Sequence, residues 1–390
     1  MNRQYGYEAQ LKIYSASFQG KSQWEWPVSL RQWRRAARLK LDAGPWGYVE
    51  GNAGLETTTR ANRLAFDRYR IRSRVLRNVE SRDLSVSLFG RRLAVPFLVA
   101  PIGAQAIIHQ DADGGGAEAA AACEVPYILS TLSAFPLEDI ARRMGDAQRW
   151  FQLYPGRDPD IIASWLARAE TSGYSAIVVT VDTTMPGWRT VDLQNLYLPF
   201  LHGHGLANFF SDPAFRARLK RPPEEDPGAA VQEFQSVYVN PAFTWTDLER
   251  IKSLTQLPVL IKGITHPDDA REAQERGFDG VVVSNHGGRQ VDGGIASLDA
   301  LVEIKRIVDP NFPLLLDSGV RGAADVIKAL ALGAAAVTIG RPYAYALAAG
   351  GRPGVQELLS QWKAELDLEM GLAGYTSLSQ LDQSTLARAY

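Results

Sequence analysis

The sequence lacks the residues on which several common kinds of protein depend. Cys123 is the only cysteine among 390 residues, so neither an intrachain disulfide nor a cysteine metal cluster can form. Because Cys123 follows an alanine-rich stretch, we expect it to be a small buried apolar residue. Neither sign of charge predominates, since 42 basic residues stand against 43 acidic ones. This balance gives no electrostatic reason to expect nucleic acid or an anionic membrane as a partner.

Long apolar runs are also absent. No run approaches the roughly 18 apolar residues that a membrane span requires. Residues 1–8 contain no apolar segment of the kind found in secretory signals, and Leu386–Tyr390 does not end in a peroxisomal tripeptide. We therefore expect a cytoplasmic protein without a membrane partner.

From about residue 94 onward, apolar strand-like runs alternate with helical patterns. The runs cover 96–100, 127–129, 150–153, 176–181, 258–261, 280–283, 313–316 and 336–339. The helical patterns cover 115–122, 136–144, 158–170, 246–253, 267–276, 297–308, 323–332 and a final pair, 343–349 and 355–370. Eight strand–helix units predict an α/β fold, the (β/α)8 TIM barrel. A doubly wound sheet is the alternative, but it seldom needs so many units.

We expect one domain, 1–390, in which three segments are added to the barrel. Residues 1–93 would form an N-terminal helical extension, with a helix over 29–41 that is broken at Gly44-Pro-Trp-Gly47. Residues 183–243 interrupt the rhythm after the fourth strand and are predicted to be an active-site lid. Within them, 222–228 is expected to be disordered or mobile. Residues 352–390 would form a C-terminal helix and tail.

The segment Val281-Val-Val-Ser-Asn-His-Gly-Gly-Arg-Gln290 carries the strongest chemical signal. A β-branched run typical of a buried parallel strand is followed directly by a polar, glycine-loosened loop. His286 can exchange a proton near neutral pH, and Arg289 can clamp a carboxylate with two parallel hydrogen bonds. Taken alone, the segment is also compatible with a histidine that merely hydrogen-bonds the backbone.

Polar residues or glycines follow nearly every predicted strand. Barrel enzymes carry their chemistry at these carboxyl ends, so we consider the positions together as one candidate site. They are Pro101, Ile102, Gly103, Ser130, Gln152, Tyr154, Thr180, Asp182, Lys262, Ser284, His286, Arg289, Asp317, Ser318, Gly319, Arg321, Gly340 and Arg341.

The last two strands indicate a phosphate. Gly319 with Arg321 and Gly340 with Arg341 follow strands seven and eight, whose loops frequently bind phosphate in barrels. Lys262, at the end of strand five, could form a Schiff base. Alternatively, it could place a fixed charge beside a reduced, anionic flavin ring, and the phosphate site favours this second role.

Three further candidates concern charge. Asp182 could stabilise a protonated His286. Arg189, where the lid begins, could bind a carboxylate together with Arg289, although a solvated lid arginine is the alternative. His202 and His204 have no carboxylate or cysteine at a useful spacing, so we expect no metal site.

These residues resemble the FMN-dependent L-2-hydroxy acid oxidase family over about residues 40–375, and the stretch 284–290 is the most specific match. Within that family the chain is most similar to the lactate 2-monooxygenases. This likeness rests on Ala100-Pro-Ile-Gly103, the lid sequence 198–213, His266-Pro-Asp-Asp-Ala and the stretch 340–351.

The resemblance implies FMN as cofactor, a small L-2-hydroxy acid and O2 as substrates, and a homotetramer or homo-octamer. It implies that His286 is the base and Asp182 its partner, and that Arg189 and Arg289 hold the substrate carboxylate. Tyr48 and Tyr154 would hydrogen-bond the substrate. FMN would be held by residues 101–103, Ser130, Gln152, Thr180, Lys262, Ser284, 317–319, Arg321, Gly340 and Arg341.

Two residues depart from the family pattern. The usual motif after the first tyrosine reads Tyr-x-Ala-(Ser/Gly)-Gly-Ala, whereas this chain has Glu50 and Asn52 in Tyr48-Val-Glu-Gly-Asn-Ala. The lid tyrosine of lactate oxidases has only Tyr238 as a candidate counterpart.

The expected reaction is oxidation of the hydroxy acid, with L-lactate as the expected substrate, by hydride transfer or by a carbanion route. If the keto acid leaves before it meets peroxide, the enzyme is an oxidase. If the keto acid is retained, the products are acetate, CO2 and water. The rivals are a dehydrogenase that passes electrons to a membrane or cytochrome and a catalytically silent phosphate-binding barrel.

Overall fold

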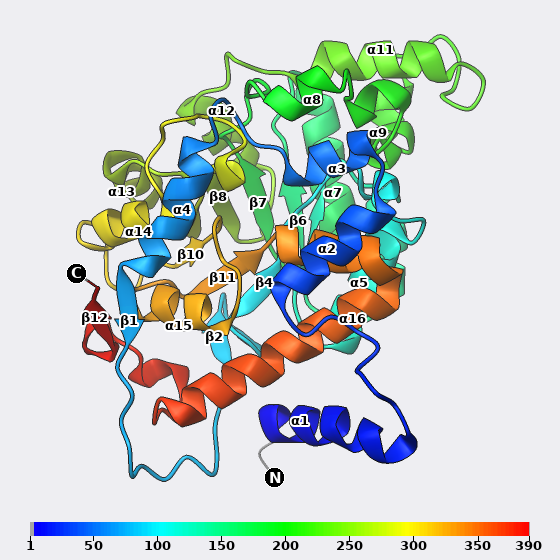
Figure 1. Cartoon of the computed structure of the whole chain (residues 1–390). Helices are drawn as coiled ribbons and strands as arrows, with labels where there is room; N and C mark the ends of the chain where they lie inside the picture. Colours follow the sequence, from blue (N-terminus) through cyan, green and yellow to red (C-terminus); the bar gives the residue numbers. More distant parts are fainter. Residues whose placement is uncertain (1–3, 390) are drawn as a thin grey trace.

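The computed structural model describes residues 4–389, and a closed parallel barrel of eight strands lies at its centre (Figure 1). The strands are β4 (Phe97–Val99), β5 (Tyr127–Ser130), β6 (Arg149–Leu153), β7 (Ile177–Thr180), β8 (Val259–Ile264), β9 (Gly280–Val283), β10 (Leu314–Leu316) and β11 (Ala336–Ile339). Pairing of β11 with β4, in which Val337 lies opposite Phe97, closes the ring. The predicted barrel is confirmed, and the closed ring rules out a doubly wound sheet.

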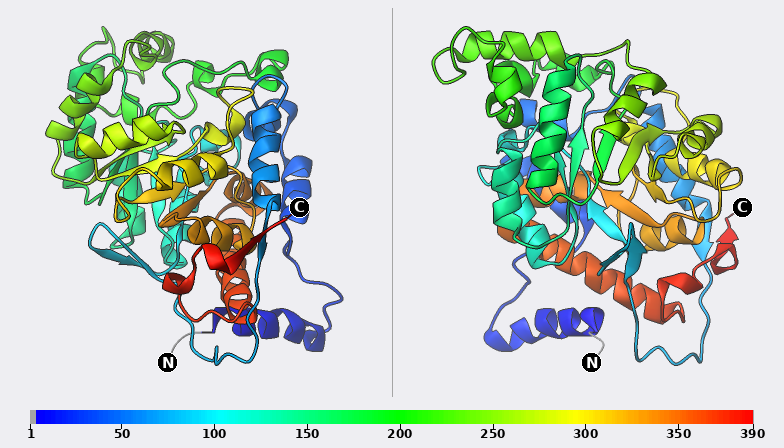
Figure 2. Two further views of the ribbon diagram at one scale, coloured as in Figure 1. Left: turned by 90° about the vertical axis from the view of Figure 1, so that its left-hand side faces the viewer. Right: turned by 180° about the vertical axis from the view of Figure 1, so that it is seen from behind.

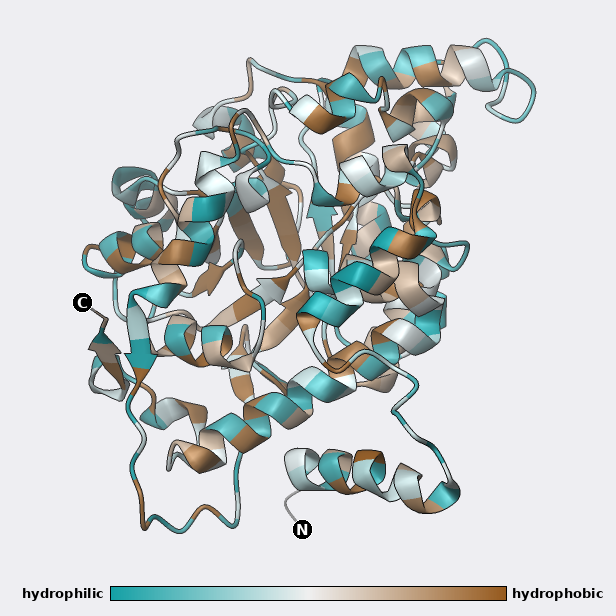
Figure 3. Cartoon of the chain, in the orientation of Figure 1, coloured by the Kyte–Doolittle hydropathy of each residue, from teal (hydrophilic) through white to brown (hydrophobic). Residues whose placement is uncertain are grey.

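The strands are mostly apolar because both of their faces are buried, and several of their polar residues stand near the carboxyl ends. One set of side chains fills the barrel interior, including Leu98, Ile128 and Trp150. The other set packs outward against the surrounding helices. Figure 3 shows the result as hydrophobic strands in the centre of the molecule, with hydrophilic residues on the outer helices.

The barrel helices follow the strands in the predicted order. They are α5 (Ala112–Ala122), α6 (Leu137–Met144), α7 (Pro159–Thr171), α12 (Trp245–Ser253), α13 (Pro267–Glu275), α14 (Ser297–Lys305), α15 (Ala323–Ala331) and α16 (Arg341–Leu372). Gly350 and Gly351 have non-helical backbone angles inside α16. The predicted final pair of helices is therefore confirmed, since α16 consists of two helical parts separated by a kink at these glycines.

Residues before the barrel form α1 (Tyr5–Ser15), η1 (Ala16–Gln19), α2 (Leu30–Lys40), α3 (Ala43–Glu50), α4 (Thr57–Asp67), β1 (Tyr69–Ile71) and a hairpin of β2 (Val86–Leu88) and β3 (Arg91–Leu93). The hairpin was not predicted. Leu88 and Leu93 belong to the cluster that fills the barrel interior, and Phe89 packs edge-on against Trp150. The hairpin therefore covers one end of the barrel core.

The expectation that Gly44-Pro-Trp-Gly47 is a helix breaker was wrong. These residues lie inside α3. Pro45 is tolerated there because it stands in the first helical turn, whose N–H groups have no partner within the helix. A side chain at Gly44 or Gly47 would collide with Tyr197 or with Asn195 and Val191. The glycines thus let α3 approach the segment that follows β7.

The segment 183–243 folds into short helices: α8 (Thr190–Gln194), η3 (Pro199–His202), α9 (Ala207–Phe210), α10 (Pro213–Arg216) and the longer α11 (Pro227–Tyr238). Both views in Figure 2 place it at the end of the molecule opposite α1. The expectation of disorder over 222–228 was wrong, because Arg216 pairs with Glu224 and Asp226 caps α11 through the Ala229 N–H. The charged residues and prolines of this stretch therefore form a turn and the start of α11.

The two ends of the described chain are fixed to the body. Tyr69–Ile71 pairs antiparallel with β12 (Leu386–Arg388), and α1 lies along α16 (Figure 1). No helix within 4–389 is long and apolar enough to cross a membrane. The expectations about the extreme ends concern in part residues 1–3 and 390, which lie outside the described residues.

Asp367 on α16 joins α1 to the loop before the hairpin. Its carboxylate is almost fully buried and accepts hydrogen bonds from the Gly6 N–H at 3.0 Å and from Arg82 Nε and Nη2 at 2.8 and 2.7 Å. Asp367→Ala leaves the Arg82 charge without its partner, so we expect it to lower the free energy of unfolding by about 3–5 kcal/mol in urea titrations.

The matched control is Arg92→Ala, which breaks the exposed pair with Asp83 and should cost no more than about 1 kcal/mol. A loss for Asp367→Ala as small as that of the control would contradict the prediction.

Candidate active site

A single pocket at the carboxyl ends of the strands gathers most of the predicted site residues. Of these, it is lined by Tyr48, Pro101, Ile102, Gly103, Tyr154, Arg189, Lys262, His286, Arg289, Asp317, Ser318, Gly319, Arg321, Gly340 and Arg341. Ser130, Gln152, Thr180, Asp182 and Ser284 do not line it. They stand behind the lining residues and hydrogen-bond one another or the groups in front of them.

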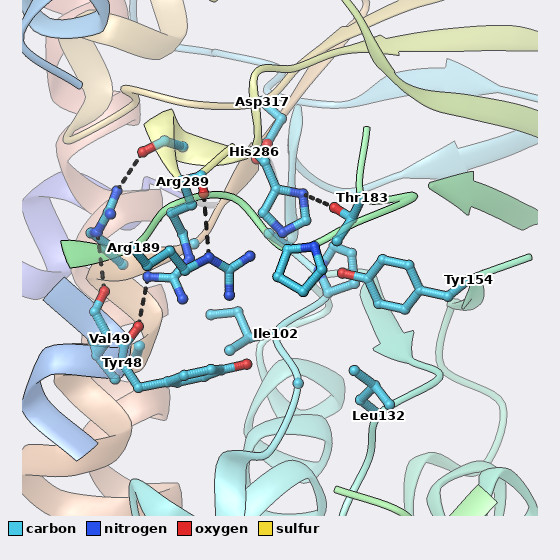
Figure 4. Close-up of a pocket in the computed structure, with 18 of the residues that line it drawn as sticks. Tyr48, Val49, Ile102, Leu132, Tyr154, Thr183, Arg189, His286, Arg289 and Asp317 are labelled. Atoms are coloured by element: carbon cyan, nitrogen blue, oxygen red, sulfur yellow. Dashed lines mark hydrogen bonds between the residues drawn. The ribbon is translucent and has the colours of Figure 1, made fainter. Parts of the chain in front are cut away.

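His286 enters the pocket from the loop after β9. Its backbone has a φ of 56°, and Gly287 and Gly288 follow with φ of 68° and 78°. This run of left-handed residues is tolerated because two of the three are glycine. The ring Nδ1 lies 2.8 Å from Asp182 Oδ1 and 3.1 Å from Thr183 Oγ1. Figure 4 shows the ring pointing into the pocket between the two arginines and Tyr154.

The aspartate–histidine pair defines the protonation state of the imidazole. Burial alone would raise the pKa of Asp182, but His286 and Lys262 outweigh it and lower that pKa to about 2. Burial lowers the pKa of His286, against the opposing effect of Asp182. An ionised carboxylate can only accept, so Nδ1 carries the hydrogen and donates it to Asp182. Nε2 is then a free base on the pocket side.

Two guanidinium groups lie side by side on one wall of the pocket (Figure 4). Arg289 Nη1 donates to the backbone carbonyls of Tyr48 and Gly51 at 2.6 and 2.7 Å. Arg189 donates from Nε to the Arg289 carbonyl at 3.3 Å and from Nη2 to Gln290 Oε1 at 2.8 Å. Burial, followed by the charge of Arg189, lowers the pKa of Arg289 to about 9. An anion between these groups would relieve both effects.

Tyr48 and Tyr154 point their hydroxyl groups toward the same space from opposite sides (Figure 4). Burial raises the pKa of both phenols, so both remain hydrogen-bond donors at neutral pH. Tyr238 packs edge-on against Tyr154, with ring centroids 5.6 Å apart, and lines the same pocket. Its place there supports it as the lid tyrosine.

Lys262 and Asp317 form the polar floor of the pocket. Lys262 Nζ lies 3.5 Å from Asp317 Oδ2 and donates to Ser284 Oγ at 3.2 Å. Although burial lowers the pKa of Lys262, Asp317 and Asp182 outweigh it and raise that pKa. The amine is therefore held protonated, which argues against a Schiff-base role and for a fixed positive charge.

A row of hydrogen bonds joins three adjacent strand ends. Ser130 Oγ donates to Gln152 Oε1 at 3.1 Å, and Gln152 Nε2 donates to Thr180 Oγ1 at 3.0 Å. Thr180 lies opposite Lys262 in the β7–β8 pairing. The row therefore lies beside Lys262, behind the residues that line the pocket.

Arg321 and Arg341 mark the other end of the pocket. Arg321 is buried, and burial together with the charge of Arg341 lowers its pKa to about 10. Within residues 4–389 neither guanidinium forms an ion pair with a carboxylate. Gly319, with a φ of 86°, and Gly340, at the start of α16, bring backbone close to the same place. Two neighbouring like charges without a carboxylate partner in the described part of the chain are suited to a phosphate.

The two departures from the family motif have structural partners. Glu50 pairs with Arg34 on α2 and accepts from the Tyr345 hydroxyl on α16. Asn52 accepts from Arg341 and from Thr59. Both residues therefore fasten α3 near the phosphate end, and neither lines the pocket.

Sequence reasoning missed a second set of lining residues. They are Val49, Leu132, Thr183, Pro186, Leu198, Phe200, Leu201, Phe234, Gln235, Val239, Gly287, Thr338 and Ala344. Thr183 and Gly287 adjoin predicted residues, so their neighbourhood was a signal. Phe200 and Phe234 lie in the predicted lid, but no pattern in the sequence singled them out, because only tertiary folding brings them over the barrel.

His202 stacks on Tyr197. Within 4–389 no group of three or more His, Cys, Asp or Glu residues could hold a metal ion.

Fold and pocket together define the class of protein: a barrel enzyme that binds a phosphorylated cofactor beside a carboxylate. A family model described as FMN-dependent dehydrogenase matches residues 37–388. The chain belongs to this family, which oxidises 2-hydroxy acids with FMN.

Several relatives are similar over nearly their whole length. An L-lactate oxidase of Lysinibacillus sphaericus is 42% identical over 93% of this chain and 93% of its own. The peroxisomal (S)-2-hydroxy-acid oxidase GLO4 of Oryza sativa subsp. japonica is 36% identical over 92% of this chain and 95% of its own. A crystal structure of mandelate oxidase with (S)-4-hydroxymandelic acid has a TM-score of 0.82 at 38% identity, covering 93% and 99% of the two chains.

The residues present fit FMN. The Arg321–Arg341 end suits its phosphate, and the row from Ser130 to Thr180 suits its polar ring edge. Lys262 supplies a buried positive charge, 4% exposed, next to that row. No carboxylate stands unpaired on this floor, because Asp317 is engaged by Ser284, Thr338 and Lys262.

The pairing of His286 with Asp182 predicts a pH behaviour. In the FMN-loaded protein we expect the imidazole of His286 to titrate below the ordinary histidine value of about 6.5. In Asp182→Asn the midpoint should fall further, because the counter-charge is gone. NMR of protein labelled at histidine, assigned with His286→Gln, measures both midpoints. A rise on removal of Asp182 would contradict the pairing.

Proposed function

We propose that this chain oxidises L-lactate with O2 and decarboxylates the product in the same pocket, giving acetate, CO2 and water. The observation that carries this proposal is a pocket roofed by the segment 183–243, with Leu198, Phe200, Leu201, Phe234 and Tyr238 in its lining. An apolar roof over a polar floor would hold a small keto acid and exclude bulk water.

The substrate carboxylate would bind Arg189 and Arg289, two guanidinium groups that line the same pocket. Tyr48 and Tyr154 would donate hydrogen bonds to the substrate oxygens from two sides. This set of contacts fixes the 2-hydroxy group near His286, so that the reacting atoms are aligned before the chemical step.

His286 Nε2 would accept the hydroxyl proton. Its lowered pKa leaves it unprotonated at neutral pH, and Asp182 stabilises the imidazolium once the proton has arrived. When bound, FMN accepts the two electrons of the hydroxy acid and delivers them to O2. Lys262 would stabilise negative charge near the floor of the pocket.

Retention of the keto acid determines the final products. Pyruvate and hydrogen peroxide held together react at high effective molarity and need no further catalytic group. A peroxide oxygen attacks the keto carbon, the O–O and C1–C2 bonds break, and acetate, CO2 and water result.

Gly103 supports this outcome because it leaves room in the pocket wall, and not because the backbone there requires a glycine. Its φ is outside the left-handed region, whereas the next residue, Ala104, has a φ of 57°. A Cβ at Gly103 would come within 3.0 Å of Leu132 Cβ, also in the pocket lining. The glycine therefore keeps room where a larger residue would press on the wall.

The second candidate is an oxidase that releases 2-keto acid and hydrogen peroxide. It is favoured by the similarity of this chain to L-lactate oxidases of Lysinibacillus sphaericus and Nostoc sp.. The two candidates share every step up to oxygen reduction and differ only in whether the keto acid leaves first.

We also propose a homotetramer or homo-octamer, to which the exposed apolar side chains of Leu11 and Phe18 on the α1–η1 segment would contribute.

The stoichiometry of L-lactate turnover in air, without catalase, tests the proposal. We expect one acetate and one CO2 per O2 consumed, with almost no free peroxide. In Gly103→Ala the crowded wall should promote release, so peroxide and pyruvate should rise. Pyruvate and peroxide accumulating one-to-one with O2 in the wild type would identify an oxidase instead.

The role of Arg289 predicts a kinetic effect of Arg289→Lys. Lysine cannot hold the Tyr48 and Gly51 carbonyls and at the same time present a planar fork to the substrate. We expect kcat/KM for L-lactate to fall by a factor that corresponds to a loss of about 1.5–3 kcal/mol in transition-state stabilisation. The FMN content should be unchanged. Arg250→Lys, on the exposed face of α12, is the matched control. Equal kcat/KM values for the two variants would show that Arg289 does not bind the substrate carboxylate.

A further inference from the structure

Asp192 is a buried carboxylate that the proposed reaction does not use. It lies in the first turn of α8 and is 7% exposed. Within residues 4–389 neither of its oxygens has a hydrogen-bond partner. A buried ionisable group without hydrogen bonds is costly, so its presence calls for an interaction that repays the cost.

The nearest cations are the two arginines of the pocket. Asp192 Oδ2 lies 4.0 Å from Arg289 Nη2, and Arg189 stands at the start of the same short helix. Burial raises the pKa of Asp192, and the charges of Arg289 and Arg189 act against that rise. Among the described residues, no other carboxylate comes within ion-pair distance of either guanidinium.

Contacts other than this carboxylate fasten α8. That helix is fastened to α3 by Asn195 Nδ2, which donates to the Ala43 carbonyl at 3.0 Å, and by close contact at Gly47. The backbone of Asp192 contributes a separate bond, since its carbonyl accepts from the Tyr197 N–H. What the side chain adds is charge beside Arg289.

The charges define what the pocket can accept. Arg289 Nη1 is already committed to two carbonyls, and Asp192 faces Nη2 from outside the pocket lining. The remaining donors of Arg289 are left for a ligand. Two guanidiniums and one carboxylate carry a net charge of one, which a single carboxylate group neutralises.

We propose that Asp192 is a positioning residue that orients Arg289 and limits the two-arginine site to ligands with one carboxylate group. This inference rests on the proposed function, in which Arg189 and Arg289 hold the substrate carboxylate. Without Asp192 the site would carry one more positive charge and would favour a dianion over a monoanion.

The test compares pyruvate, a monoanion, with oxalate, a dianion. Both are titrated into the FMN-loaded protein, and binding is followed by the change in flavin absorbance, so no turnover is needed. In Asp192→Asn the ratio of the two dissociation constants should shift toward oxalate by about tenfold, because the added unit of charge acts twice on a dianion. Asp192→Glu, which keeps the charge, should leave the ratio near that of the wild type.

Asp192→Ser is a second charge-removing variant and should show the same shift if the asparagine variant does not fold. A loss of affinity that is equal for both ligands would reduce Asp192 to a structural residue and overturn the inference, as would an unchanged ratio. If the wild type binds neither anion, the two-arginine carboxylate site itself is wrong, and the proposed function fails with it.

Discussion

The ion pair between Lys262 and Asp317 is the constraint on which the rest of the pocket depends. Lys262 comes from β8 and Asp317 from the end of β10, while Ser284 after β9 and Thr338 on β11 donate to the same carboxylate. Four consecutive strands are thereby joined at one level of the barrel. Because both charges are buried, each requires the other, and the side chains of the pocket floor hold one another in place.

Positive charge above that floor is in excess, and its distribution explains the division of the pocket. Arg321 and Arg341 stand at one end with no carboxylate partner among residues 4–389, and a cofactor phosphate would neutralise them there. Arg189 and Arg289 stand at the other end with Asp192 as a partial counter-charge. His286 lies between; burial keeps its imidazole neutral, and Asp182 balances its charge once a proton arrives. The same principle, that buried charge must be balanced, thus separates cofactor, base and substrate.

The barrel and much of the pocket could be predicted from the sequence for a physical reason. Strands buried on both faces are continuous apolar runs, so their ends are visible, and the polar residues that follow must meet at one edge. The hairpin at 86–93 could not be predicted, because Arg91 and Arg92 give its second strand a polar sequence and the burial of that strand depends on contact with the barrel. Phe200, Phe234 and Asp192 were likewise hidden, since their importance arises from contacts between segments far apart in the chain. Glu50 departs from the family motif, and its role becomes clear only from its contacts with Arg34 on α2 and Tyr345 on α16.

The close approach of α3 to α8 through Gly44 and Gly47 has a consequence for protein engineering. The first part of the roofing segment is locked to the N-terminal extension by packing that admits no side chain at these positions. Beyond Tyr197, Phe200 contacts α3 through its side chain, edge-on against Tyr48, and not through a glycine. Loops exchanged between relatives to alter substrate range should therefore be joined after Tyr197, where the graft leaves both arginines and their registration with α3 intact. A graft begun at Asp182 would have to carry the matching α3 with it.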